Sequence, residues 1–252
     1  MGTYIQIFKF PNQSAKRKFE EHLESYVGSA KTYSRIILNL GDKSFEVPLK
    51  ILIEKVPVQQ SIVPSGSVVD KRYRIKADVP REVVHLDGKW NIKEMEVVEY
   101  VSYGVDPIAS YSLLVGSSKR GVRGVSDALR RLGLSVPVQL KIRFAHRSFF
   151  VEMLRELGSI GWVYIGEIPD YHVKGAMFHG VRLEDSDVFR DLVERGGRIR
   201  AIVIYNEVKR VKIILSEGGT IYSQQKLDGE TAAEEIKDII ETFQHYGLIG
   251  VA

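Results

Sequence analysis

The order of the predicted elements between residues 136 and 205 constrains the fold more than any other feature of this 252-residue sequence. The spacing of apolar residues there predicts a strand, a helix, two strands, a helix and a strand in succession. The predicted elements span residues 136–144, 148–157, 160–168, 171–179, 186–195 and 198–205. Strands interrupted by helices in this way predict an α+β arrangement, with the helices packed against a sheet.

The same region carries an internal repeat with an offset of 39 residues. Phe150 and Gly158 in the first copy fall opposite Phe189 and Gly197 in the second. A duplicated strand-helix-strand unit explains this match. The full order of elements is typical of a ferredoxin-like βαββαβ sandwich, in which two helices cover one face of a four-stranded antiparallel sheet.

A hairpin and a terminal helix are predicted to extend this sandwich. The hairpin pairs residues 207–215 with 220–225 around Gly218-Gly219. The helix begins with a capping box of Thr231 and Glu234 and ends at Gly247. Its buried stripe consists of Ala232, Ile236, Ile239, Ile240 and Phe243.

The first part of the chain is predicted to hold one helix among antiparallel strands. A strand over residues 3–9 precedes a helix that ends at Val27, before Gly28. Further strands are predicted over residues 33–40, 44–55, 68–78, 82–86 and 89–103, the last two joined by an Asp87-Gly88 turn. We therefore predict an antiparallel sheet domain with one helix over residues 1–115. A second domain over residues 116–252 holds a basic loop and helix and then the ferredoxin-like part.

One face of the predicted strand 68–78 is cationic, because Arg72, Arg74 and Lys76 alternate along it. Glu94 and Glu96 lie on the strand across the hairpin. We expect these two carboxylates to neutralise the cations, in preference to a ligand binding there.

The composition excludes several classes of site. With no cysteine, the chain has no disulfide, no thiolate nucleophile, no zinc ribbon and no cysteine-ligated cluster. The first ten residues alternate like a strand and lack the features of a signal peptide, and no apolar run is long enough to span a membrane. We expect a cytoplasmic protein with no membrane partner. Few Asn, Gln and Met residues among many charged ones favour a thermophilic source.

Positive charge is concentrated in one short segment. Residues 116–147 contain 8 Lys and Arg against 1 Asp, whereas residues 148–252 contain 12 against 17 Asp and Glu. In this segment Lys119, Arg120 and Arg123 alternate with Gly121 and Gly124, ahead of a helix that we predict to include Ser126 in its first turn. Glycines let backbone N–H groups approach an anion, and a helix start adds partial positive charge. The pattern therefore predicts a phosphate-binding loop, although not a Walker A loop, because no Gly-Lys-Ser or Gly-Lys-Thr follows.

The preferred hypothesis is a non-enzymatic protein that binds the phosphate backbone of DNA or RNA with low sequence specificity. The candidate contact residues are Lys119, Arg120, Arg123, Arg130, Arg131, Lys141, Arg143 and Arg147. A search for the stacking aromatics of RNA-binding ferredoxin-like sheets finds Lys141 where the first strand needs an aromatic residue.

Two alternatives remain. In the first, the basic segment docks on acidic surface of a neighbouring subunit or another protein, so that the chain is an assembly subunit. In the second, Asp170, Glu207 and Lys209 form a metal-dependent nuclease or phosphodiesterase site. The histidines show no metal-ligand spacing, so neither a metal nor another cofactor is expected, and a non-enzymatic role is favoured.

Overall fold

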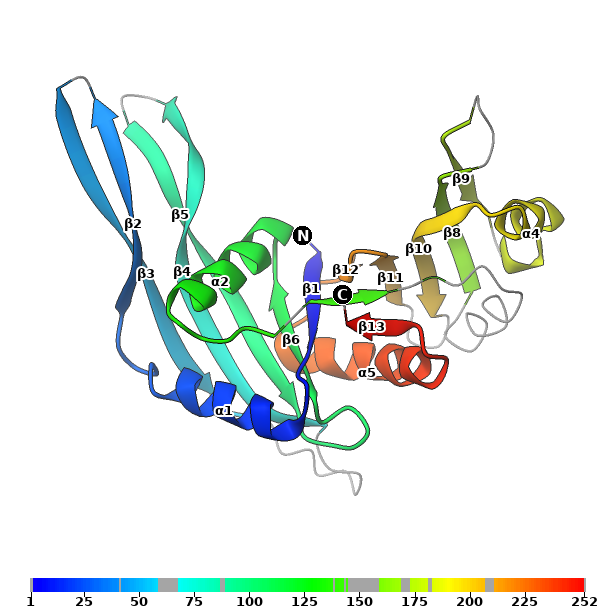
Figure 1. Cartoon of the computed structure of the whole chain (residues 1–252), viewed down its shortest axis with the longest axis horizontal. Coiled ribbons are helices and arrows are strands. Elements are labelled where there is room, and N and C mark those ends of the chain that lie inside the picture. The colour runs from blue at the N-terminus through cyan, green and yellow to red at the C-terminus, as the bar shows by residue number, and fades with distance from the viewer. Residues whose placement is uncertain are drawn as a thin grey trace. The chain divides into compact units, whose positions relative to one another are not determined.

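The structure is a computed structural model that describes residues 2–40, 42–58, 68–86, 89–137, 139–142, 144, 159–168, 173–180, 183–206 and 211–251. The protein is an α+β protein, as predicted, with four α-helices among these residues (Figure 1). None of the helices in the described ranges is both long and apolar enough to cross a membrane.

The chain divides into two compact units. The α2 unit comprises Phe8–Val138 and Asp228–Glu230, and the α4 unit comprises Met1–Ile7, Gln139–Leu227 and Thr231–Ala252. The elements of the α2 unit are α1 (Gln13–Glu24), β2 (Lys31–Leu40), β3 (Lys43–Val56), β4 (Val69–Leu86), β5 (Lys89–Tyr103), β6 (Tyr111–Gly116) and α2 (Lys119–Arg131). Those of the α4 unit are β7 (Leu140–Ile142), β8 (Ser159–Gly166), β9 (Gly175–His179), the 3-10 helix η1 (Leu183–Asp185), α4 (Asp187–Glu194), β10 (Arg198–Asn206), β11 (Val211–Ser216), β12 (Thr220–Ser223) and β13 (Ile249–Val251). Two elements, β1 (Thr3–Lys9) and α5 (Gly229–His245), have residues in both units.

Eleven strands form one antiparallel sheet in the order β2-β3-β4-β5-β6-β1-β12-β11-β10-β8-β9, and β13 pairs with β7 in a separate sheet. The predicted domain boundary near residue 115 stays a prediction. Helix α2, which follows that position, contacts β2, β4, β5 and β6 and belongs to the same compact unit as these strands.

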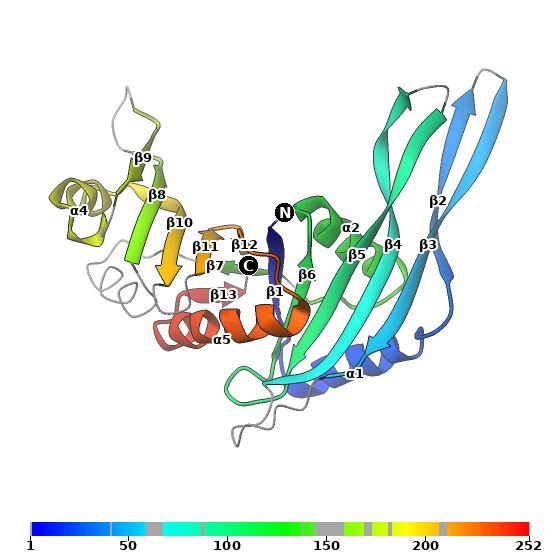
Figure 2. The same ribbon diagram turned by 180° about the vertical axis from the view of Figure 1, so that it is seen from behind.

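Both helices of the α2 unit pack on the same face of its strands. In Figure 1 α2 lies in front of β4 and β5, and from behind, in Figure 2, the strands lie in front of α2. On α1, Phe19 contacts Tyr100 with 5.5 Å between ring centroids, and Tyr100 lies directly opposite Tyr73 in the β4–β5 register. Tyr73 shares its face of β4 with Val79, the residue on which α2 packs.

The other face of β4 carries the three alternating cations Arg72, Arg74 and Lys76. Glu99 accepts hydrogen bonds from the two arginines at 2.8 and 3.4 Å, and Glu54 accepts one from the lysine at 2.7 Å. Arg72 is also paired with Glu230 at 2.8 Å. The predicted neutralisation is therefore confirmed, but the predicted partners are wrong. The β4–β5 register places Glu94 and Glu96 on the face that the helices cover.

Strand β4 continues where the sequence predicts a break between two strands. Pro80 has no N–H to donate to a neighbouring strand, and the β4–β5 register shifts between Pro80 and Val84. Proline is tolerated at such an irregularity, so β4 runs on to Leu86. Helix α1, in contrast, ends at Glu24, three residues before the predicted Val27.

A polar cavity of about 210 Å³ lies beside α1. Lys16 is only 5% exposed, and its Nζ donates to the carbonyl oxygens of Tyr103 and Ala109, the latter at 2.6 Å. Burial lowers the pKa of Lys16. Glu20, also buried, accepts a hydrogen bond from the Tyr100 hydroxyl at 3.2 Å and pairs with Lys71 at 3.1 Å. Other groups of the protein supply hydrogen bonds and an ion pair to Lys16 and Glu20, which favours a structural role for these two buried charges.

The buried tyrosines predict a loss of stability in alkaline solution. Burial, followed by the negative charge of Glu24, raises the pKa of Tyr73 above its ordinary value near 10, and burial likewise raises that of Tyr100. The unfolded chain then loses protons first as the pH rises above 10, so the free energy of unfolding falls. The slope is up to ~1.4 kcal/mol per pH unit for each tyrosine. Urea unfolding on either side of pH 10 should show a shallower decline for Tyr73→Phe than for the native chain, and equal slopes would contradict this assignment.

The strands of the α4 unit bury one of their two faces. Strand register aligns one residue from each of β1, β12, β11, β10, β8 and β9 in a row: Ile5, Ile221, Leu215, Ile202, Val163 and Phe178. The first five side chains of this buried row have no exposed surface. Helix α4 covers the end of the row, because Phe189 packs edge-on against Phe178 with ring centroids 6.3 Å apart.

The topology does not show the predicted ferredoxin-like split. That arrangement needs the strand at residues 136–144 inside the same sheet as the three strands that follow it. Instead β7 pairs with β13, and β10 pairs directly with β8. β7 is only three residues long, and besides its pairing with β13 the Ile142 N–H donates to the carbonyl of Glu217, in the turn after β11, at 3.2 Å. The predicted helix over residues 148–157 lies outside the described residues.

The predicted hairpin and terminal helix are confirmed, although residues 207–210 of the predicted hairpin lie outside the described residues. β11 and β12 pair antiparallel, and Gly219 in their turn has φ +73°. α5 begins at Gly229, two residues before Thr231, so Thr231 lies inside the helix and does not cap it. The predicted stripe of five apolar residues on α5 is buried. Gly247 ends the helix at φ +66°, and the Leu248 N–H donates to the Phe243 carbonyl at 2.9 Å.

Candidate anion-binding site on α2

Helix α2 has an apolar side and a cationic side. Val122, Val125, Ala128 and Leu129 recur at helical spacing, and each is at most 3% exposed. The remaining side carries five of the predicted contact residues, all exposed: Lys119, Arg120, Arg123, Arg130 and Arg131. Packing against the strands therefore fixes the helix so that its cations face solvent.

The glycines of this segment lie within the helix, so the predicted phosphate-binding loop is wrong. Ser118 is the N-cap, and its hydroxyl accepts a hydrogen bond from the Gly121 N–H at 2.8 Å. A Cβ atom at Gly124 would lie 2.5 Å from Cγ1 of Val79, and one at Gly121 would overlap the Glu96 carboxylate. Gly121 and Gly124 therefore allow α2 to pack closely on β4 and β5.

The protein's own carboxylate already occupies the start of α2. The Ser118 hydroxyl lies 3.3 Å from both carboxylate oxygens of Glu96. Negative charge at this end of a helix is stabilised by the helix dipole. The positive end of the helix dipole at the start of α2 is therefore already compensated by the protein.

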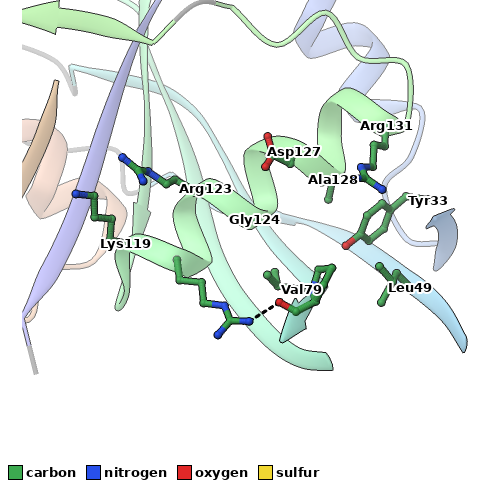
Figure 3. Close-up of a pocket in the computed structure, with 11 residues that line it drawn as sticks. Tyr33, Leu49, Val79, Lys119, Arg123, Gly124, Asp127, Ala128 and Arg131 are labelled. Atoms are coloured by element: carbon green, nitrogen blue, oxygen red, sulfur yellow. Dashed lines mark hydrogen bonds between the residues drawn. The ribbon is translucent and has the colours of Figure 1, made fainter. Parts of the chain in front are cut away.

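A groove of about 520 Å³ lies beside α2 (Figure 3). Tyr33 of β2, Leu49 of β3, and Val79 and Pro80 of β4 supply apolar surface to it. Four of the five α2 cations line it: Lys119, Arg120, Arg123 and Arg131. Figure 3 shows the Arg131 side chain directed toward Tyr33, whereas those of Lys119 and Arg123 extend away from Val79.

Among the described residues, Asp127 alone forms an ion pair with a cation of α2. Arg120 donates to the Pro80 carbonyl, and Arg131 donates to the Ser34 hydroxyl at 2.9 Å, so both contact neutral acceptors. Arg130 pairs with Asp127 at 2.9 Å, with half or more of both side chains exposed. Exposed pairs of this kind contribute at most about 1 kcal/mol and separate readily. For Lys119 and Arg123 the structure shows no ion pair or hydrogen bond to any described side chain.

Tyr33 links the groove to the sheet. Its hydroxyl donates to the carbonyl oxygen of Asp78. Burial raises the pKa of Tyr33, opposed by the nearby Arg131 and reinforced by Asp78 and Asp127. The phenol therefore stays neutral at ordinary pH and supplies a flat, half-buried ring to the groove.

The other three predicted contact residues come after α2 in the chain. Lys141 is exposed on β7, in the α4 unit, while Arg143 and Arg147 lie outside the described residues. The predicted nuclease residues, Asp170, Glu207 and Lys209, also lie outside them. No cluster of three or more potential metal ligands occurs in the part of the chain that the structure describes.

Sequence reasoning missed the apolar residues of the groove. Tyr33, Leu49 and Pro80 come from three strands, and only the strand register and the docking of α2 bring them together. Pro80 gave one usable signal, since a proline within a run of strand residues marks an irregularity in strand pairing. At this irregularity the Pro80 carbonyl is the acceptor for Arg120.

Comparison with protein-family models found no match, and a search of curated proteins found none similar to this chain.

Proposed function

We propose that the protein binds the phosphate backbone of nucleic acid through α2, without catalysis and with low sequence specificity. The observation that carries this proposal is the set of five exposed cations on one helix with a single carboxylate, Asp127, among them. Nucleic-acid affinity of this kind comes from cations that neutralise phosphates and release bound counterions.

The spacing of the cations suits a linear polyanion. Lys119 and Arg123 are four residues apart and therefore neighbours on one side of the helix. From Lys119 to Arg130 the helix rises by roughly 16 Å at 1.5 Å per residue. A single DNA strand places about five phosphates along that length, at about 3.4 Å of helix axis each. Several phosphates can therefore contact α2 together.

The same residues account for the expected lack of sequence preference. Lysine and arginine side chains that contact phosphates position a nucleic acid but do not read its bases. The apolar surface next to them, in which Tyr33 is hydrogen-bonded to Asp78, offers among the described residues no set of free donors and acceptors that matches a base-pair edge.

Removal of two α2 charges should weaken binding selectively. In a Lys119→Ala, Arg123→Ala double variant we expect affinity for duplex DNA at low salt to fall about tenfold, because each contact to a charged group contributes roughly 1.5 kcal/mol or less at an exposed site. A Lys18→Ala, Lys31→Ala variant removes the same charge from exposed positions elsewhere in the α2 unit and should bind within about twofold of the native protein. Fluorescence anisotropy with labelled duplex DNA and duplex RNA measures both. Equal losses in the two variants would refute a site on α2.

A further inference from the structure

The strands of the α4 unit have a second face, and its side chains differ from those of the buried row on the first face. Strand register again aligns one residue from each strand, in the order β1, β12, β11, β10, β8 and β9: Tyr4, Tyr222, Ile214, Val203, Trp162 and His179. We name this the aromatic row. Because side chains alternate along a strand, it lies on the opposite face from the buried row.

Several large apolar side chains on this face are open to solvent. Tyr164 and Met177 lie directly opposite each other on β8 and β9 and are 40% and 65% exposed. Tyr205, two residues after Val203 on β10, is 39% exposed. Helix α4 packs on the other face, through Phe189 and Phe178. Tyr164, Met177 and Tyr205 thus place exposed apolar surface on one face of these strands, and contiguous exposed apolar patches often mark binding sites.

The aromatic rings are spaced along the row. Tyr4 and Tyr222 lie on adjacent strands with ring centroids 4.7 Å apart. Trp162 is three strands further from Tyr222, roughly 14 Å at the usual distance between strands. Tyr164 follows Trp162 on the same face of β8. Flat rings repeated across a sheet in this way form a surface on which several planar groups can stack.

The charges of this face favour an anionic ligand. On its described strand positions the charged side chains are cations, Lys212 opposite Tyr205 and Arg198 opposite Gly166. Arg198 shares Glu217 and Glu167 with Arg200, so that group of four is balanced. Lys212 has no ion pair with any described residue, and it adds positive charge beside Tyr205.

We infer that the face carrying the aromatic row binds single-stranded nucleic acid, by stacking unpaired bases on Tyr222 and Trp162 of the row and on the adjacent Tyr164, with Lys212 near the phosphates. Planar bases joined by anionic phosphates match both the rings and the charge. A duplex does not, because its bases are already stacked and covered by each other. This site is separate from the cations of α2, and it stands whether or not α2 binds a duplex.

Tryptophan fluorescence tests the inference directly. The chain has two tryptophans, so Trp90→Phe leaves Trp162 as the only one. Titration of this variant with a short single-stranded oligothymidylate or oligouridylate should quench its emission, whereas a blunt duplex of the same length should not. Adding Tyr164→Ala should weaken binding about tenfold, in line with the contribution of one stacked base. Adding Val188→Ala, which changes an exposed apolar residue on α4, should leave the affinity for the single strand unchanged.

Absence of quenching by single strands at low salt would overturn the inference, and so would equal affinity with and without Tyr164. Quenching that depends on protein concentration alone would also overturn it, because it would indicate that a second copy of the chain covers the row. Should Trp90→Phe impair folding, anisotropy of a labelled single strand with the native chain and with Tyr164→Ala gives the same comparison. The Lys119→Ala and Arg123→Ala substitutions, added to Trp90→Phe, should leave the quenching by single strands unchanged. Loss of duplex binding through α2 and loss of single-strand binding through the aromatic row can therefore be measured separately.

Discussion

Replacement of Gly219 by alanine is expected to lower the free energy of unfolding by about 3 kcal/mol or more. Gly219 has φ +73°, a conformation that costs a residue with a Cβ atom roughly 1–2 kcal/mol. The added Cβ would also overlap the carbonyl oxygen of Leu140 on β7, a backbone atom that cannot turn aside like a side chain. Overpacking of this kind costs a further 1–3 kcal/mol, roughly.

Gly218 provides the matched control for this substitution. It is the neighbouring residue of the same turn, and a Cβ atom there would have no heavy atom within 4 Å. Chemical denaturation of Gly218→Ala should therefore give a stability within about 0.5 kcal/mol of the native protein. If Gly219→Ala were equally mild, the close approach of β7 to the β11–β12 turn would be wrong.

Substitution of Glu99 by alanine is expected to destabilise the protein by about 3 kcal/mol. Its carboxylate accepts hydrogen bonds from Arg72, from Arg74 and, at 2.9 Å, from the backbone N–H of Gly229 at the start of α5. Arg72 is only 7% exposed, and loss of one partner of a buried ion pair leaves an uncompensated charge that costs roughly 3–5 kcal/mol. Glu230 still pairs with Arg72, which places the expected cost at the lower end of that range.

The exposed pair of Glu46 and Arg35 serves as the control. It is also a cross-strand pair of the α2 unit, at 2.8 Å, but more than half of each side chain is exposed. Glu46→Ala should cost less than about 1 kcal/mol, as is usual for solvent-exposed pairs. Urea unfolding of the two variants measures the difference. Similar losses for Glu99 and Glu46 would contradict the role assigned to Glu99.

Elements with strong local patterns were predictable from the sequence. The apolar stripe of α5 and its stop at Gly247 follow from helical spacing, and the β11–β12 turn follows from two consecutive glycines. The pairing of β7 with β13 was not predictable, because three residues carry too little pattern to choose a partner strand. The choice depends on hydrogen bonds between residues more than 70 positions apart, such as that from Ile142 to Glu217.

The candidate site, like the fold, was predictable from the sequence only in part. Clustering of cations in residues 116–147 predicted that α2 would be basic, and all five of its cations are exposed. The glycine pattern misled, because glycine inside a helix costs about 1 kcal/mol relative to alanine and so favours a loop reading. At Gly124 the close contact with Val79 offsets that cost, and no local signal in the sequence indicates it. The aromatic row could not be predicted because its residues come from six strands, and only the register of these strands aligns them on one face.

The salt dependence of nucleic-acid binding tests the central claim most directly. If at least three of the five cations on α2 contact phosphates, the logarithm of the association constant for duplex DNA should fall against the logarithm of salt concentration with a slope of about −3 or steeper. The slope should become shallower by about 1 for each contact removed, and so by about 2 in the Lys119→Ala, Arg123→Ala variant. Absence of binding at low salt, or a slope that this variant leaves unchanged, would contradict the assignment of α2 as the phosphate-binding element.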